Sequence, residues 1–230
     1  MDTATQPDYP PTPRTVPSRK RERVRYDAAT VHAVLDAEFV CHLGFVHDGG
    51  PVVLPTVYAR VDDRLYLHAS TGSRLALALP EEGLAVCVTV SLVDALVLAR
   101  SWIGHSLNYR SVVVHGTARR VTDPAEALAA LAALVDHMLP GRAADSRPPT
   151  AAELAKTAVL RVDLREASAK VRDHGVSDDP GDLALPHWAG LVPLTRGLGA
   201  PVPAPDLPGE TPVPGYLEAA CAPGRAAPAR

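Results

Sequence analysis

Closely spaced strand patterns joined by short turns constrain this chain most. An apolar run from Phe39 to Val46 ends in the turn sequence His-Asp-Gly-Gly at 47–50, and a second run from Val52 to Arg60 follows directly. A third run, from Leu65 to Ala69, follows after four intervening residues. Two hairpins in succession predict an antiparallel sheet, and a sheet of such short strands favours closure into a barrel.

The rest of the chain adds further strands and a few helices. Pro55 lies inside the second run, which predicts an edge position or a bulge because proline cannot donate to a sheet ladder. More strands are expected at 84–91 and 96–100, as a hairpin around 93–95, and at 109–121 and 159–164. Capping residues predict helix starts after Asp27, Ser73, Asp123 and Thr150. The sequence therefore predicts a mainly β fold with helices (α+β), an antiparallel barrel of six or seven strands.

Proline placement divides the 230 residues into three parts. Of the 23 prolines, 13 lie in the first seventeen residues or in the tail from Gly199 onward. We expect a disordered basic and proline-rich arm at 1–25, one folded domain at 26–194 and a proline-rich flexible tail at 195–230. The basic run from Arg19 to Arg25 is either a solvated leader or an arm that reaches a phosphate or an acidic neighbour.

The composition indicates in which compartment the protein lies and which partners it has. No apolar run approaches the roughly 20 residues needed to span a bilayer, and the first residues carry no secretory pattern. Cys41 and Cys87 lie in strand-like runs, where a reduced and buried thiol is usual. The net charge of −3 gives no basic field for nucleic acid. We therefore expect a cytoplasmic protein with neither a membrane nor a nucleic acid as its partner.

Two stretches carry residues suited to an anionic, ring-bearing ligand. Ser73 and Arg74 follow a glycine where a strand gives way to a helix, and Arg110 and Ser111 stand where a strand with three valines enters the sheet. Hydroxyl and guanidinium donors at such positions can hold a phosphate. An ordinary helix cap and a surface salt bridge are the plain alternatives. Lys170 and Arg172, after the last expected strand, face either the same pocket or water.

The histidines and tryptophans leave several functions open. His42, His68, His105 and His115 lack zinc-site spacing, which argues against a metal site, but haem needs only one axial histidine. A Ser-His-Asp hydrolase is not indicated, because the chain has no Gly-x-Ser-x-Gly motif. Trp188 is either a core residue or a lid that stacks on a flat ring.

Several of these motifs, taken in order, resemble a known family. They are Cys41 to Phe45, Leu65 to His68 with Thr71 to Arg74, Leu96 to Ser101, His105 to Val114, Ala167 to Arg172 and Pro186 to Gly190. The chain resembles the pyridoxamine 5′-phosphate oxidase-like proteins with an FMN-binding split barrel, in particular the flavin-nucleotide-binding and nitroimidazole-resistance (Nim) branch. The resemblance extends from about Tyr26 to Leu194.

The resemblance implies a homodimer with two FMN sites, each at the subunit interface. Ser73 and Arg74 would hold the FMN phosphate, and Arg110 and Ser111 would lie beside the cofactor. The other implied contacts are the backbone of Pro55, Thr56 and Val57 along the isoalloxazine edge and His68 in the pocket. Trp188, on the lid interpretation given above, is a further candidate cofactor residue. Leu75 follows Arg74 where many members carry a second cation, which weakens the phosphate contact.

The expected function is that of an FMN-dependent oxidoreductase. Hydride would pass through the flavin to a small planar or nitro-aromatic substrate, and no catalytic side chain is assigned because the ring carries the chemistry. Two alternatives remain: a haem-binding split barrel with a histidine axial ligand, and a non-catalytic flavin-binding dimer. The deazaflavin F420 is a further alternative cofactor, since the fold alone does not determine the reaction.

Overall fold

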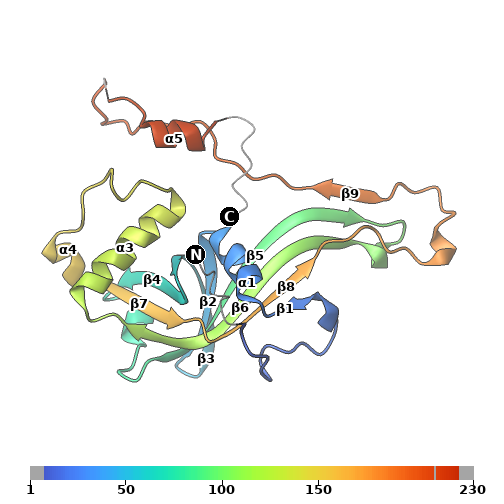
Figure 1. Cartoon of the computed structure of the whole chain (residues 1–230), viewed down its shortest axis with the longest axis horizontal. Helices are drawn as coiled ribbons and strands as arrows, with labels where there is room; N and C mark the ends of the chain where they lie inside the picture. The colour runs from blue at the N-terminus through green and yellow to red at the C-terminus, as the bar shows by residue number, and fades with distance from the viewer. Residues whose placement is uncertain (1–7, 210, 223–230) are drawn as a thin grey trace, which may run out of the picture.

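The computed structural model describes residues 8–209 and 211–222, which form an antiparallel sheet that closes on itself (Figure 1). The strand order is β1-β8-β6-β7-β4-β3-β2-β5-β9, and an additional pairing joins β5 to β6. That pairing completes a ring of six strands, β2-β3-β4-β7-β6-β5, from which β1, β8 and β9 extend. The mainly β fold and the antiparallel barrel predicted from the sequence are therefore confirmed.

The elements have the following bounds. The strands are β1 Val24–Arg25, β2 Val40–His47, β3 Gly50–Val61, β4 Arg64–Ser70, β5 Leu84–Leu98, β6 Ser106–Arg120, β7 Thr157–Asp163, β8 Glu166–Arg172 and β9 Gly190–Pro193. The α-helices are α1 Ala28–Asp36, α2 Arg74–Leu77, α3 Pro124–Met138, α4 Ala151–Ala155 and α5 Gly215–Ala220. Three short 3-10 helices are η1 Arg21–Arg23, η2 Trp102–Gly104 and η3 Pro180–Asp182.

The barrel core is formed by alternating side chains of the ring strands together with one face of α1. Val31 and Leu35 of α1 are fully buried, and the fully buried Tyr58 of β3 donates a hydrogen bond from its hydroxyl to the Leu35 carbonyl. Cys41 of β2 lies in the same core, where burial raises the pKa of its thiol to about 12. This cysteine is therefore an inert packing residue and not a nucleophile.

The capping residues in the sequence predicted the helix starts correctly. Asp27 and Asp123 accept hydrogen bonds from backbone N–H groups at the starts of α1 and α3, and Thr150 with Glu153 forms a capping box before α4. Pro55 lies in the part of β3 that pairs with β2, whereas the pairing of β3 with β4 begins only at Tyr58. The edge position expected for this proline is confirmed.

One expected hairpin is instead a single strand. Residues 84–91 and 96–100 were expected to be two strands around a turn at 93–95, but β5 continues through this segment with only a bulge between Val93 and Ala95. The carboxylate of Asp94 accepts hydrogen bonds from Arg110 on the neighbouring β6, and this contact ties the segment to the ladder. The strand count of the ring is six, and β1, β8 and β9 add to it outside the ring.

The β5–β6 pair extends beyond the barrel as an arm (Figure 1). Its ladder runs from the Leu84–Ala118 pair to the Val97–Ser106 pair, and η2 forms the tip. β9 pairs with the outer part of β5, and β8 pairs with β6 from residue 109 to residue 115. The arm therefore carries strands on both of its edges.

The described part of the N-terminal segment packs on the barrel. The Tyr9 side chain is 5% exposed, and its hydroxyl lies 2.8 Å from His32 Nε2 and 3.1 Å from Asp63 Oδ1. Val24 and Arg25 pair with Lys170 and Ala169 of β8. Part of the segment expected to be disordered thus makes packing contacts, and residues 1–7 of the arm lie outside the described residues. In the tail, α5 was not expected, and Tyr216 donates to Asp145.

The buried His32 makes stability depend on pH. Burial and the positive charge of Arg60 lower the pKa of His32 in the folded protein. The unfolded chain therefore binds more protons below about pH 6.5, and the stability that this group contributes is present above that pH and lost as the pH falls through it.

We predict that His32→Gln lowers the pH sensitivity of folding. Chemical unfolding measured at about pH 7.5 and about pH 5.5 should show a smaller loss of unfolding free energy for the variant than for the wild type. His47→Gln, at a partly exposed position, should keep the wild-type difference. Equal losses in the wild type and His32→Gln would contradict this role for His32.

Candidate functional site

One group of expected site residues lies where β3 and β4 separate. The last pair before the separation joins Tyr58 to Leu67, so Val57 and His68 stand one step beyond it on neighbouring strands. The His68 side chain is exposed. Pro55 and Thr56 continue along β3 from this point. The structure therefore brings the expected ring-edge residues and His68 together.

The expected phosphate residues follow directly after β4. A turn joins the Ser73 N–H to the Ser70 carbonyl at 2.9 Å, and Ser73 then caps α2 by accepting a hydrogen bond from the Ala76 N–H at 3.2 Å. Arg74 is the first residue of α2, and its side chain is exposed. Ser73 thus has the structural role of a helix cap, while Arg74 is accessible to a ligand.

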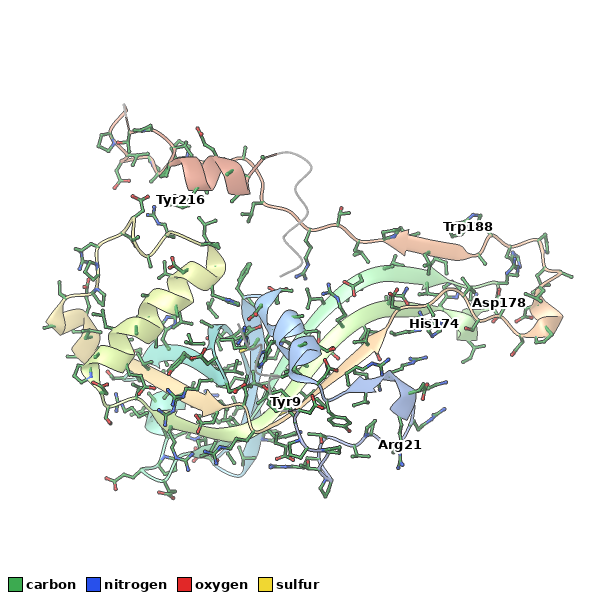
Figure 2. All side chains as sticks on the ribbon, viewed as in Figure 1. Tyr9, Arg21, His174, Asp178, Trp188 and Tyr216 are labelled. Atoms are coloured by element: carbon green, nitrogen blue, oxygen red, sulfur yellow. The ribbon has the colours of Figure 1, made fainter. Side chains whose placement is uncertain are left out.

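The remaining expected residues lie on the arm. Arg110 is bidentate to Asp94, with Nη2–Oδ1 and Nε–Oδ2 distances of 2.8 and 3.0 Å, and this contact raises the pKa of Arg110. Ser111 is opposite Ser91 on β5 and Lys170 on β8. Trp188 precedes β9 far out along the arm and is 67% exposed (Figure 2). Within one chain, Arg110, Ser111 and Trp188 are therefore separate from the β3–β4 group.

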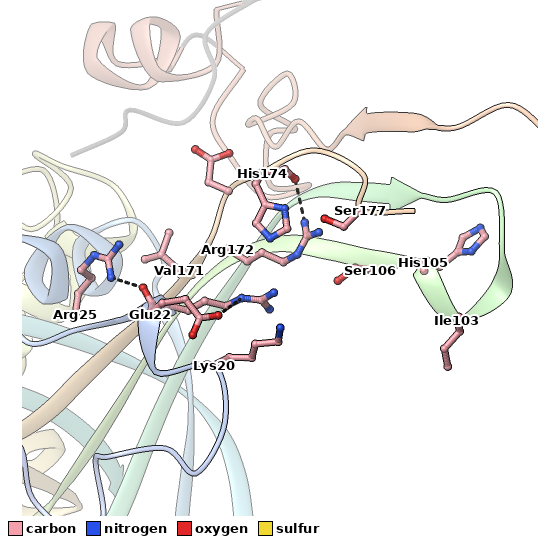
Figure 3. A pocket seen from close by; sticks show the side chains of 13 residues that line it. Lys20, Glu22, Arg25, Ile103, His105, Ser106, Val171, Arg172, His174 and Ser177 are labelled. Carbon is pink, nitrogen blue, oxygen red and sulfur yellow. Dashed lines mark hydrogen bonds and ion pairs between the residues drawn. The ribbon is translucent and has the colours of Figure 1, made fainter. Parts of the chain in front are cut away.

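A cleft, which we call the cationic cleft, lies where three segments of the chain meet (Figure 3). Residues 20–25 form one wall, the end of β8 and residues 173–177 form another, and the arm tip at residues 103–106 forms the third. Its volume is about 570 Å³. The basic run of the N-terminal segment thus meets Arg172, two positions that the sequence singled out separately.

Arg172 is the best-buried charge of the cleft. Its side chain donates from Nη1 to Asn108 Oδ1 and, at 3.1 Å, to the His174 carbonyl, and from Nη2 to the Gly175 carbonyl at 3.3 Å. The residue is 4% exposed, and its Nε has no hydrogen-bond partner among the described residues. Burial and the nearby positive charge of Arg23 lower the pKa of Arg172.

Two histidines of the cleft have the same hydrogen-bond pattern. His105 Nδ1 lies 2.8 Å from the Ser101 carbonyl, and His174 Nδ1 lies 3.0 Å from the Gly175 carbonyl. A carbonyl only accepts hydrogen bonds, so Nδ1 carries the proton and Nε2 keeps its lone pair. This is the tautomer in which an imidazole binds a metal through Nε2.

Within residues 8–209 and 211–222, no three His, Cys, Asp or Glu side chains gather in a way that could hold a metal ion. In the same part of the chain, no helix has both the length and the apolar character needed to cross a membrane.

The fold and these sites define a split-barrel protein with a cationic cleft beside the outer part of its arm. Residues 27–171 match the sequence model of the pyridoxamine 5′-phosphate oxidase family. The chain belongs to this family, which confirms the resemblance noted from its motifs. No similar sequence is found among the curated proteins at a significant level.

Solved structures add detail to this assignment. The flavocytochrome Anf3 from Azotobacter vinelandii is 39% identical, with a TM-score of 0.85 over 93% of this chain and 98% of that one. A FAD and haem binding protein from Mycobacterium smegmatis is 36% identical, with a TM-score of 0.81 over 86% and 97% of the two chains. A nitroimidazole resistance protein homologue from Bacteroides thetaiotaomicron, 22% identical with a TM-score of 0.55 over 64% and 86%, shares the fold.

Proposed function

We propose that this protein is a flavin- and haem-binding oxidoreductase. The observation that carries the proposal is the 39% identity, over 93% of this chain, to a flavocytochrome. The cationic cleft supports it. Among the described residues, its buried arginine has no carboxylate partner and the Nε2 atoms of its two histidines have no hydrogen bond, which suits an acidic, iron-containing cofactor. Haem thus joins the flavin in this proposal, whereas the sequence alone offered it as an alternative.

The flavin that we propose is FAD. The motif resemblance implied FMN, but a 36% identical relative that aligns over nearly its whole length is described as binding FAD. FMN and F420 are outcomes of the test below. A flavin supplies hydride and electron transfer through its ring, while the protein supplies binding and orientation.

The residues of this chain that would hold the flavin are those predicted from the sequence. Arg74 is exposed beside β4 and would contact a phosphate, and the β3 backbone at 55–57 would follow the ring edge next to His68. A small planar or nitro-aromatic molecule remains the proposed acceptor, because flat rings stack on one another.

A homodimer is part of the same proposal. Arg110, Ser111 and Trp188 lie on the arm, apart from the β3–β4 group, and a second copy of the chain could bring an arm to that group. The arm tip presents Trp102 and Ile103 with 97% and 91% of their surface exposed, which suits an interface.

We predict that the full chain has a mass of twice 24.2 kDa in light scattering. Replacing Trp102 and Ile103 together by serine should raise the dimer dissociation constant at least about tenfold, because two large apolar side chains lose their burial. Val202→Ser, at an equally exposed position of the tail, serves as the control. A monomeric wild type would refute the dimer.

We predict that Arg74→Ala weakens flavin binding by about 1.5–3 kcal/mol, the usual contribution of a hydrogen bond to a charged group. Quenching of flavin fluorescence on titration of the flavin-free protein measures the change. Arg120→Ala, an exposed arginine at the end of β6, is the matched control. Unchanged affinity in Arg74→Ala would show that the phosphate lies elsewhere.

The proposed function is tested by an absorption spectrum of the purified protein and by mass identification of the cofactors that denaturation releases. We expect a flavin band together with a haem Soret band, and FAD and haem b in the released fraction. Recovery of FMN or F420 would correct the flavin, and a protein that takes up neither flavin nor haem would refute the proposal.

A further inference from the structure

The cationic cleft concentrates positive charge in a chain that is acidic overall. Its lining carries Lys20, Arg23, Arg25 and Arg172 against Glu22 and Asp173, four cations and two anions, which gives a formal charge of +2. The whole chain has a net charge of −3. A concave surface with this sign attracts anions.

Arg172 differs from Arg100 and Arg110 in having no carboxylate partner among the described residues. Arg100 is paired with Asp178 at 2.5 Å and Arg110 with Asp94 at 2.8 Å, so each of these charges is compensated. Arg172 donates only to an amide oxygen and to backbone carbonyls in the described chain. A buried charge without a counter-charge is costly, and a bound anion would remove that cost.

The histidines narrow the class of anion. A phosphate or pyrophosphate would use the cations of the cleft but has no need of two imidazoles whose Nε2 atoms are free. Haem uses both kinds of group, because its two propionates are anions and its iron takes an axial imidazole nitrogen. The cleft volume of about 570 Å³ lies within the range of cofactor pockets.

We propose that the cationic cleft is the haem site, in which Arg172 and Lys20 with Arg23 face the propionates and His105 or His174 supplies the axial nitrogen. The assignment rests on the proposed function, since it presupposes that the protein binds haem. It places the haem beside the outer part of the arm and not at His68, which stays with the flavin residues between β3 and β4.

The test uses the full chain, loaded with flavin and titrated with hemin, and reads the Soret band and the flavin band separately. The double variant His105→Gly with His174→Gly should lose the Soret band and keep the flavin band, and added imidazole should restore the Soret band. His47→Gly, a histidine outside the cleft, should bind hemin as the wild type does. The single variants then identify the axial residue, because only the one that supplies it loses the band.

The proposed contact with the propionates is tested by removing the positive charges of the cleft. Arg172→Gln should weaken hemin binding about ten- to a hundredfold, the effect of losing a charge-assisted contact. Since a change at a buried arginine can impair folding, Lys20→Gln with Arg23→Gln provides a second test at less buried positions, with at least about a tenfold loss expected. Arg120→Gln is the control for charge alone.

Three results would overturn the assignment in different ways. A Soret band unchanged in the histidine double variant and in the charge variants would place haem elsewhere and leave the proposed function intact. If the charge variants lost flavin binding and kept haem binding, the cleft would be assigned to the flavin phosphates. A wild type that takes up no hemin would refute both the haem part of the proposed function and the assignment of the cleft.

Discussion

The pairing of β5 with β6 is the constraint on which the other features depend. Its inner half closes the six-stranded ring, because β5 also pairs with β2 and β6 also pairs with β7. Its outer half leaves the barrel and carries the arm residues far from the β3–β4 group. A single long ladder thus separates two regions of one chain, the β3–β4 group on the barrel and the cationic cleft beside the outer part of the arm.

The presence or absence of a carboxylate partner distinguishes Arg110, which has a structural role, from Arg172, which is a candidate ligand residue. Arg110 looked like a ligand residue in the sequence, yet Asp94 neutralises it across the β5–β6 ladder. Arg172 looked like either a pocket residue or a solvated one, yet it is buried and without a carboxylate among the described residues. Since a fold gains little from a buried, uncompensated charge, the second pattern points to a ligand far more strongly than the first.

Sequence patterns predicted most of the barrel and little of the cleft. The hairpin at 39–60, the helix caps and the edge position of Pro55 each depend on residues that are adjacent in the sequence. They could therefore be predicted from the sequence alone. β8 was missed because its inward positions, Ala167 and Ala169, give a weak apolar signal, and β9 is only four residues long. The cleft joins residues 20–25, 103–106 and 171–177, which no local pattern connects. Only the sheet register, which pairs β1 with β8, brings the first and last of these together.

The N-terminal wall of the cleft is held differently from the other two walls. Residues 20–25 belong to a segment fastened at one end by the two-residue strand β1 and at the other by the hydroxyl contacts of Tyr9 with His32 and Asp63. The barrel ring does not include this segment. Thr12 and Arg14 also bind Glu166 of β8, so these contacts and those of Tyr9 must open together before this wall of the cleft can move. Such a local opening would leave the pairings of the ring strands in place.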